Sequence, residues 1–165
     1  MRPRTGGRVV SAPETFNFLG FTHISGQSRR GGFQLKRKSR SDRVRARLRV
    51  IKETLRRRMH GTIDEQGAWL RRVVMGFNAY HGVPTNAGAL ADFRHNVADI
   101  WRRTLRRRGQ KGAVTWQRMT LLADRWLPTP RITHPWPGKR FAVKHPRWEP
   151  GAGVLHAGIC AGGMR

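Results

Sequence analysis

Three consecutive segments between Ser41 and Arg108 repeat apolar side chains at helical spacing, and this pattern limits the possible fold most strongly. An apolar residue every three or four positions is typical of a helix that buries one side. The apolar positions are Val44, Leu48, Ile51, Leu55 and Met59 in the first segment, Trp69, Leu70, Val73, Val74, Phe77 and Tyr80 in the second, and Leu90, Phe93, Val97, Ile100, Trp101 and Leu105 in the third. Because such helices bury these sides against one another, the sequence predicts a helical bundle.

The predicted helix ends come from residues with known preferences. Ser41 and Asp42 are suited to cap the first helix, and Gly61 is suited to follow its end. Thr62 and Glu65 have the spacing of a capping box, which opens the second helix. The predicted ranges are 41–60, 62–82, 85–108 and 115–126, the last burying Trp116, Met119 and Leu122, with Gly76 placed for a close helix contact in the second.

A β-hairpin is predicted upstream of the helices, over residues 14–38. Its first strand, residues 15–23, is aromatic and has Gly20 in its middle, where another backbone can approach closely. A basic turn over residues 27–32 leads to a second strand over residues 33–36. Because an isolated hairpin is only marginally stable in water, its aromatic side chains need another surface to pack on.

The two ends of the chain carry no helical or strand period. Residues 1–13 are basic and contain Gly and Pro, which predicts a flexible lead-in. Residues 128–165 are rich in Pro and Gly, which predicts an extended and poorly ordered tail. The predicted fold is therefore mainly α: an N-terminal β-hairpin, a three- to four-helix bundle over residues 39–127, and an irregular C-terminal tail.

The charge of the chain favours a polyanionic partner. The sequence holds 34 Lys and Arg against 9 Asp and Glu, a formal net charge of +25. Repulsion at this charge destabilises a compact fold unless an anion neutralises it. Most of the basic residues are arginine, whose planar guanidinium binds phosphate and stacks on bases, so nucleic acid is the expected partner.

Two groups of basic residues are the predicted nucleic-acid-binding sites. The first is a row on one side of the first helix, about 16 Å long at about 1.5 Å per residue. Between Arg40 and Arg58 only Asp42 and Glu53 oppose nine basic residues, which favours phosphate contact over a merely solvated side. The second group ends the third helix. The predicted residues are Arg45, Arg49, Lys52 and Arg56 in the row, and Arg102, Arg103, Arg106, Arg107 and Arg108 at the helix end.

Other chemistries have little support in the sequence. The nine acids include no pair on an apolar strand that would hold two Mg²⁺ ions. His156 and Cys160 are the nearest pair of metal-ligand type, and a structural zinc needs four ligands. We therefore expect no metal, cofactor or catalytic residue. With no apolar run of about 20 residues and a single cysteine, we also expect no membrane association and a cytoplasmic location.

The order of motifs along the chain resembles that of bacterial group II intron-encoded proteins. Residues 13–23, with Phe18, Leu19, Gly20 and Phe21 at their centre, are similar to the seventh reverse-transcriptase block of that family. The residues that resemble its maturase-specific region, called domain X or the thumb, are Trp69, Gly76, Tyr80, Asn86, Phe93, Trp101, Leu105, Arg107, Arg108 and Trp116. Segments 127–135, 149–150 and 159–163 also resemble such proteins, so the resemblance covers residues 13–163.

The resemblance implies a role for each part. In the family the hairpin closes the palm and helps to hold the primer terminus, so residues 18–21 would form a primer-grip-like site. The thumb is a helical bundle that binds intron RNA and the template–primer duplex. The motif residues Trp69, Gly76, Tyr80, Asn86 and Trp101 would be mainly structural.

The chain also departs from the family. The Tyr-Ala-Asp-Asp catalytic motif, the fingers, most of the palm and the His-Asn-His endonuclease are all missing, so the chain looks like the C-terminal part of a maturase and is not expected to be an enzyme. Three functions remain open. The chain binds group II intron RNA or an RNA/DNA duplex and assists splicing, it completes a reverse transcriptase by docking to a separately encoded palm and fingers, or it is a non-functional remnant that binds polyanions by charge.

Overall fold

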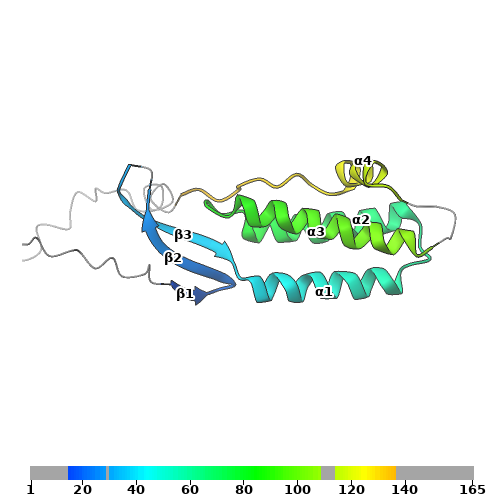
Figure 1. Cartoon of the computed structure of the whole chain (residues 1–165), viewed down its shortest axis with the longest axis horizontal. Coiled ribbons are helices and arrows are strands. Elements are labelled where there is room, and N and C mark those ends of the chain that lie inside the picture. Colours follow the sequence, from blue (N-terminus) through cyan, green and yellow to red (C-terminus); the bar gives the residue numbers. More distant parts are fainter. Residues whose placement is uncertain (1–14, 29, 109–113, 137–165) are drawn as a thin grey trace, which may run out of the picture. The chain divides into compact units, whose positions relative to one another are not determined.

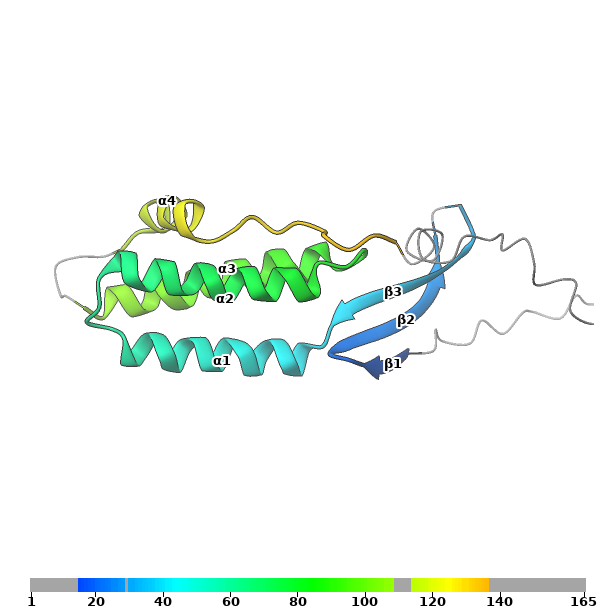
Figure 2. The same cartoon turned by 180° about the vertical axis from the view of Figure 1, so that it is seen from behind.

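The computed structural model describes residues 15–28, 30–108 and 114–136 of the chain, which divides into two compact units, Met1–His134 and Pro135–Arg165. The first unit is mainly α with an N-terminal antiparallel sheet, as predicted (Figures 1 and 2). Its elements are β1 (Thr15–Phe18), β2 (Phe21–Gln27), β3 (Phe33–Ser39), α1 (Ser41–Arg57), α2 (Ile63–His81), α3 (Ala87–Arg106) and α4 (Trp116–Trp126). None of the described helices combines the length and apolar character needed to cross a bilayer.

The sheet has three strands in the order β1-β2-β3, so the prediction of one unbroken first strand was wrong. Leu19 and Gly20 form a two-residue turn between Phe18 and Phe21, which pair directly. Both turn residues have positive φ, 45° at Leu19 and 78° at Gly20, the signs that a type I′ hairpin turn requires. The predicted turn after Gln27 is confirmed, and β3 runs three residues further than expected, to Ser39.

Polar contacts join the end of β3 to the helices. The backbone N–H of Ser39 donates to Asn86 Oδ1 at 2.9 Å, and Asn86 Nδ2 donates to Ser39 Oγ at 2.9 Å and to the carbonyl of His81 at 2.8 Å. Ser39 Oγ is also hydrogen-bonded to His81 Nδ1 at 2.9 Å. Beside them, Thr85 Oγ1 accepts from the N–H of Arg37 and donates to its carbonyl. Asn86 occupies the capping position of α3, but its side chain makes no hydrogen bond to that helix end. It binds Ser39 of the sheet instead.

Protonation of His81 is expected to destabilise this junction. Burial lowers the pKa of His81 below its ordinary value of 6.5, and burial together with the charge of Arg37 lowers the pKa of His23. Below pH 6.5 the unfolded chain therefore binds more protons than the folded chain, so the free energy of unfolding falls as the pH decreases. Urea unfolding at about pH 7.5 and about pH 5.5 measures this loss. The double variant His23→Gln/His81→Gln should lose less stability on acidification than the wild type, whereas the exposed-site control His60→Gln should lose as much.

The predicted start of α2 at its capping box is confirmed, whereas the predicted cap and the predicted last residue of α1 are wrong. Thr62 and Glu65 form the predicted capping box: Thr62 Oγ1 accepts from the N–H of Glu65 at 3.2 Å, and Glu65 Oε2 accepts from the N–H of Thr62 at 2.8 Å. The predicted Ser41-Asp42 cap of α1 is wrong, because Arg40 is the capping position and makes no side-chain cap. Asp42 instead pairs with the Arg40 guanidinium at 2.7 Å.

α1 ends at Arg57, before the predicted end at His60, and a tertiary contact satisfies carbonyls of the residues that follow it. Gln66 Nε2 donates to the carbonyl of Arg58 at 2.8 Å and lies 3.4 Å from the carbonyls of Met59 and Gly61. A side chain that satisfies the carbonyls beyond a helix removes the need for another helical turn. Gln66 itself is buried, and its Oε1 accepts from Trp101 Nε1 at 2.9 Å.

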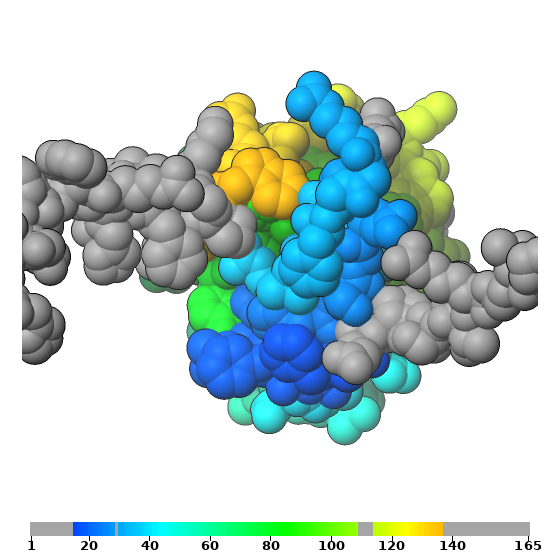
Figure 3. Space-filling model, turned by 90° about the vertical axis from the view of Figure 1, so that its left-hand side faces the viewer, coloured from blue at the N-terminus to red at the C-terminus, as the bar shows by residue number. Residues whose placement is uncertain are grey.

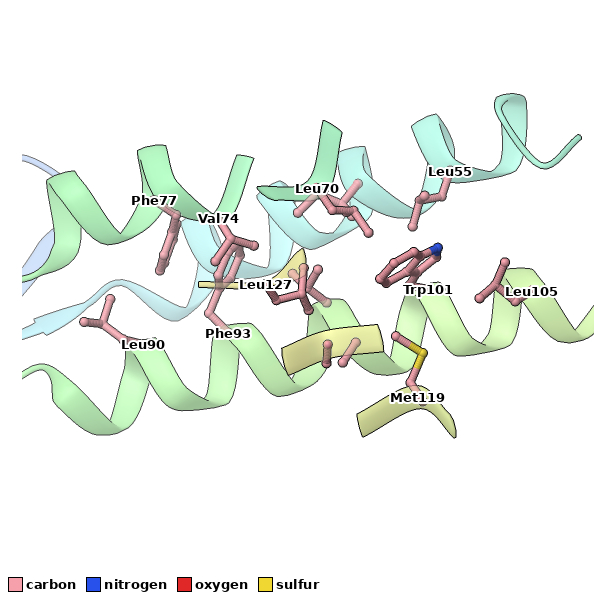
Figure 4. Packing of buried hydrophobic residues seen from close by; sticks show 14 residues of the cluster. Leu55, Leu70, Val74, Phe77, Leu90, Phe93, Trp101, Leu105, Met119 and Leu127 are labelled. Carbon is pink, nitrogen blue, oxygen red and sulfur yellow. The ribbon is translucent and has the colours of Figure 1, made fainter. Parts of the chain in front are cut away.

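The core lies between α1, α2, α3 and α4 (Figure 4). Phe77 and Phe93 stack across α2 and α3, with ring centroids 3.6 Å apart. Trp101 is fully buried at the other end of α3, near Leu55, Leu70 and Met119. The predicted stripe residues are buried or partly buried in this core except at two positions. Met59 is not part of the core, and Tyr80 is about half exposed and packs on the sheet.

α4 and the residues after it close one side of the bundle. Met119 is buried, as predicted, and Leu122 is partly buried, but Trp116 is 42% exposed and not part of the core. Thr115 is the capping residue of α4. Residues 128–134 have neither helix nor strand, as predicted, and their end is held against α2. The carbonyl of Gly82 accepts from the N–H groups of Thr133 and His134, and the carbonyl of Ala79 accepts from His134 Nε2 at 2.7 Å. Segments 1–13 and 137–165 lie outside the described residues.

The close helix contact in α2 is at Gly67 and not at the predicted Gly76. A Cβ on Gly67 would lie 2.5 Å from the Trp126 ring of α4, so any other residue would force this ring to shift. A Cβ on Gly76 would meet nothing within 4 Å. The sequence could not separate the two glycines, since the partner of Gly67 comes from a helix more than fifty residues away.

The two glycines predict opposite effects of alanine. Gly76→Ala should raise the free energy of unfolding by up to about 1 kcal/mol, because alanine favours the helix and has room for its methyl group. Gly67→Ala should lower it by about 1–3 kcal/mol, because the methyl group must displace the Trp126 ring. Urea unfolding of both variants measures the difference, and equal effects would contradict the packing of α4 on α2.

Candidate nucleic-acid interface

The two predicted basic groups meet at one groove between α1 and α3. These helices run side by side in the same direction from the sheet (Figures 1 and 2), and the groove between them has a volume of about 320 Å³. Its cations are Lys52 and Arg56 from α1, and Arg103 and Arg107 from the end of α3. All four side chains are exposed. Met59, Asn96, Asp99, Ile100 and Thr104 complete the lining.

Asp99 is the acid in this groove, and it fixes the arrangement of two arginines. Its carboxylate pairs with Arg103 at 2.7 Å and with Arg102 at 3.2 Å. Arg103 remains 71% exposed in its side chain, whereas Asp99 is only 19% exposed. Four cations against one partly buried carboxylate leave the groove strongly positive, and the Asp99 contact limits the freedom of Arg103. A cation that is already held loses less entropy when it binds a phosphate.

Arg45 and Arg49 extend the row along α1 beyond the groove. They are exposed and lie on the same side of α1 as Lys52 and Arg56, at spacings of three and four residues. The Arg45 guanidinium makes long contacts to Ser41, 3.3 Å to its carbonyl and 3.4 Å to its hydroxyl. The groove and this row together form a continuous basic side, which we call the α1–α3 basic surface: Arg45, Arg49, Lys52, Arg56, Arg103 and Arg107.

Arg102, one of the predicted nucleic-acid-binding residues, does not line this surface. Its side chain is only 16% exposed, and its guanidinium lies 4.4 Å from the centre of the Trp116 ring. Trp116 also stacks on His95, with ring centroids 5.3 Å apart. Arg102 therefore holds α4 against α3, and it also explains why Trp116 is not buried in the core.

Arg106 and Arg108 lie at the end of α3 and do not line the groove. Both are exposed, and the Arg108 guanidinium donates to the carbonyl of Gly61 between α1 and α2. Arg108 therefore ties the end of α3 to the α1–α2 connection. Of the nine predicted basic residues, four line the groove, two extend it along α1, Arg102 and Arg108 make structural contacts, and Arg106 is exposed outside the groove.

The hairpin residues 18–21 divide into exposed and buried ones. Phe18 and Leu19 are exposed at the turn, whereas Phe21 is buried against the helices. The Phe21 ring stacks on Tyr80 at 5.6 Å and lies 5.0 Å from the His81 ring. Tyr80 Oη donates to the carbonyl of Leu19 at 2.7 Å, and its ring lies over Gly20. The backbone N–H of Arg40 also donates to the carbonyl of Gly20 at 3.0 Å, so both a side chain and another part of the backbone approach this glycine.

One side of the sheet carries an exposed aromatic surface. Phe16 pairs with His23, which pairs with Arg37, so these residues share a side. The Phe16 and His23 rings stack at 4.8 Å, while Phe16 and Phe18 remain 56% and 58% exposed. Phe33, on the same side of β3 by register, is 78% exposed. The space-filling view shows β1, in dark blue, at the surface (Figure 3).

The predicted maturase-motif residues are mostly structural. Trp101 and Asn86 are buried and hydrogen-bonded, and Trp69 lies partly buried with the Arg58 guanidinium 5.3 Å from its ring centre. Tyr80 holds the β1–β2 turn, and Gly76 is exposed. Sequence reasoning missed Asn96, Asp99 and Thr104 of the groove. Their spacing with Arg103 and Arg107 on one side of α3 was the available signal.

No metal-ligand cluster is present in the described part of the chain: no three His, Cys, Asp or Glu side chains come together there. His156 and Cys160 lie outside the described residues. No protein-family model, curated protein or solved structure matches the chain.

Proposed function

We propose that this chain binds structured RNA through the α1–α3 basic surface. The convergence of Lys52 and Arg56 with Arg103 and Arg107, from helices about fifty residues apart, carries this proposal. Cations from two helices on both sides of one groove can contact successive phosphates of one strand. The net charge of +25 adds long-range attraction to any nucleic acid.

We propose further that the RNA is a group II intron RNA, and that the chain acts as a maturase-type thumb without polymerase activity of its own. The ordered resemblance of residues 13–163 to that family supports this choice. The sequence lacks the family's catalytic Asp motif, and for that reason we assign binding and help in RNA splicing and no catalytic step.

Filter binding across a salt series tests the proposal. Group II intron RNA should bind more tightly than a tRNA at the same nucleotide concentration, and its affinity should fall steeply with salt because phosphate contacts release counterions. Equal affinity for both RNAs would reduce the function to binding polyanions by charge, which is the expectation for a non-functional remnant. Affinity that does not change with salt would exclude phosphate contacts altogether.

The exposed aromatic side of the sheet favours a second candidate, docking to a separately encoded reverse-transcriptase palm. Phe16 and Phe18 on β1 and Phe33 on β3 are exposed apolar side chains, and exposed apolar surface often marks an interaction site. Primer extension by an upstream palm and fingers protein should then rise when this chain is added, and should not rise with Phe16→Ser/Phe18→Ser. No gain in activity with the wild-type chain would contradict this candidate.

A further inference from the structure

A second basic pocket lies on another side of α1, between α1 and α2. It has a volume of about 260 Å³ and is lined by Arg43, Arg47, Gly76, Phe77, Tyr80 and His81. Because successive residues of a helix are about 100° apart, Arg43 and Arg47 point well away from the row of Arg45 and Arg49. A strand bound in the α1–α3 groove therefore does not reach this pocket by following the same side of α1.

Two cations without acidic partners line the pocket. Arg43 and Arg47 lie one turn apart on α1, both exposed. Among the described residues neither forms an ion pair, although Arg40, Arg94, Arg102, Arg103 and Arg125 do. Two guanidinium groups this close repel each other, and an anion between them removes that repulsion. Phosphate fits this arrangement, since the guanidinium group can bind two of its oxygens at once.

The aromatic residues of the pocket are held firmly. Phe21 stacks on Tyr80, and the Tyr80 hydroxyl donates to the carbonyl of Leu19, so the ring is fixed from two directions. Tyr80 nevertheless keeps 53% of its surface exposed. His81 meets the Tyr80 ring edge-on and stacks on Phe77 at 4.2 Å. An exposed aromatic ring fixed beside two arginines is suited to stacking with a nucleobase.

Gly76 leaves this pocket open. It lies on the pocket wall, and a Cβ there would meet nothing within 4 Å. Packing therefore does not require glycine at this position, and a larger side chain would extend into empty space. A volume of about 260 Å³ is small for a ligand pocket, so it suits a single nucleotide and excludes a duplex.

We propose that the α1–α2 pocket binds one nucleotide, with its phosphate between Arg43 and Arg47 and its base against Tyr80. Two sources share this chemistry: a free nucleoside monophosphate, or an unpaired nucleotide of an RNA strand. In the second case the chain holds two separate RNA segments, a strand in the α1–α3 groove and a single flipped-out or unpaired nucleotide in the pocket.

Titrations followed by amide NMR shifts of the full chain test the proposal, with 5′-AMP, a single-stranded oligoadenylate and inorganic phosphate as probes. AMP or the oligonucleotide should shift the amides of Gly76, Tyr80 and His81. If only the oligonucleotide does so, the source is an RNA strand. The key variant is Gly76→Leu, which fills the pocket and keeps every charge. Gly88→Leu is its matched control, since Gly88 is also an exposed helical glycine whose Cβ would meet nothing.

Gly76→Leu and Arg43→Gln/Arg47→Gln should each weaken binding at least tenfold, and Gly88→Leu should not. Wild-type binding by Gly76→Leu would overturn the proposal, as would the absence of shifts at the pocket with both nucleotide probes. Inorganic phosphate binding as tightly as AMP would overturn the base contact. Gly76→Leu should keep the salt dependence of intron RNA binding, because it leaves the α1–α3 groove unchanged. The nucleotide titrations therefore test the pocket, and the salt dependence tests the groove, so either proposal can fail without the other.

Discussion

Replacement of Trp101 by alanine is expected to unfold the helical part of the chain or to lower its free energy of unfolding by about 3–5 kcal/mol. Trp101 is fully buried, and it packs among Leu55, Leu70 and Met119, so its removal leaves a large cavity. It also removes the donor to Gln66 Oε1. Because a domain of this size is stable by only about 5–15 kcal/mol, one such change removes much of its stability.

Two further variants separate packing from hydrogen bonding at this position. Trp101→Phe keeps an aromatic ring in the core but leaves the buried Gln66 oxygen without its donor, which should cost about 1–3 kcal/mol. Leu121→Ala is the control, since Leu121 is largely exposed on α4 and should change stability by less than about 0.5 kcal/mol. Urea unfolding gives all three values. A Trp101→Ala chain as stable as the control would contradict the core described above.

Removal of the four groove cations is expected to weaken intron RNA binding by about 100-fold at physiological salt. The variant is Lys52→Gln/Arg56→Gln/Arg103→Gln/Arg107→Gln. All four side chains are exposed, so the fold should persist, and Asp99 keeps Arg102 as its partner. The effect is large because each lost contact removes both a charge-assisted hydrogen bond and the release of counterions from the RNA.

The matched control removes the same charge elsewhere. Arg57, Arg71, Arg72 and Arg118 are exposed and do not line the α1–α3 groove. Glutamine at these four positions should weaken binding less than tenfold, through the loss of long-range attraction alone. If both quadruple variants lose affinity equally in filter binding, the RNA responds to total charge and the groove is not its site.

Local signals in the sequence predicted the helices well and their partners less well. The capping box of Thr62 and Glu65 was predictable because all its atoms come from four consecutive residues. The end of α1 was not, because Gln66 of the next helix satisfies the carbonyls beyond Arg57. Likewise, the need for glycine at position 67 depends on Trp126, which only the tertiary structure brings near.

The β1–β2 turn shows why a strand pattern can hide a hairpin. Residues 15–23 read as one aromatic strand, since Leu19 is a poor candidate for a turn position with positive φ. The usual Asn-Gly or Asp-Gly signal is missing. Tyr80, about sixty residues away, donates to the carbonyl of Leu19 and covers Gly20. A contact distant in sequence therefore stabilises a turn that the local sequence does not predict.

The candidate site was predictable in its parts and not in their arrangement. The row on α1 followed from helical spacing alone. The rotation of α3 against its neighbours decides which of its arginines face this row. Arg103 and Arg107 do, whereas Arg102 stacks on Trp116. The inward positions of Trp101 and Leu105 contain that information, because they fix which side of α3 is buried.

The salt dependence of intron RNA affinity tests the α1–α3 groove most directly. It is measured between about 50 and about 200 mM salt for the wild type and for the two quadruple variants. Four lost phosphate contacts should make the slope of log affinity against log salt concentration shallower by about 3 in the groove variant. The control variant should keep a slope close to that of the wild type. A groove variant with the wild-type slope would contradict RNA binding at this site.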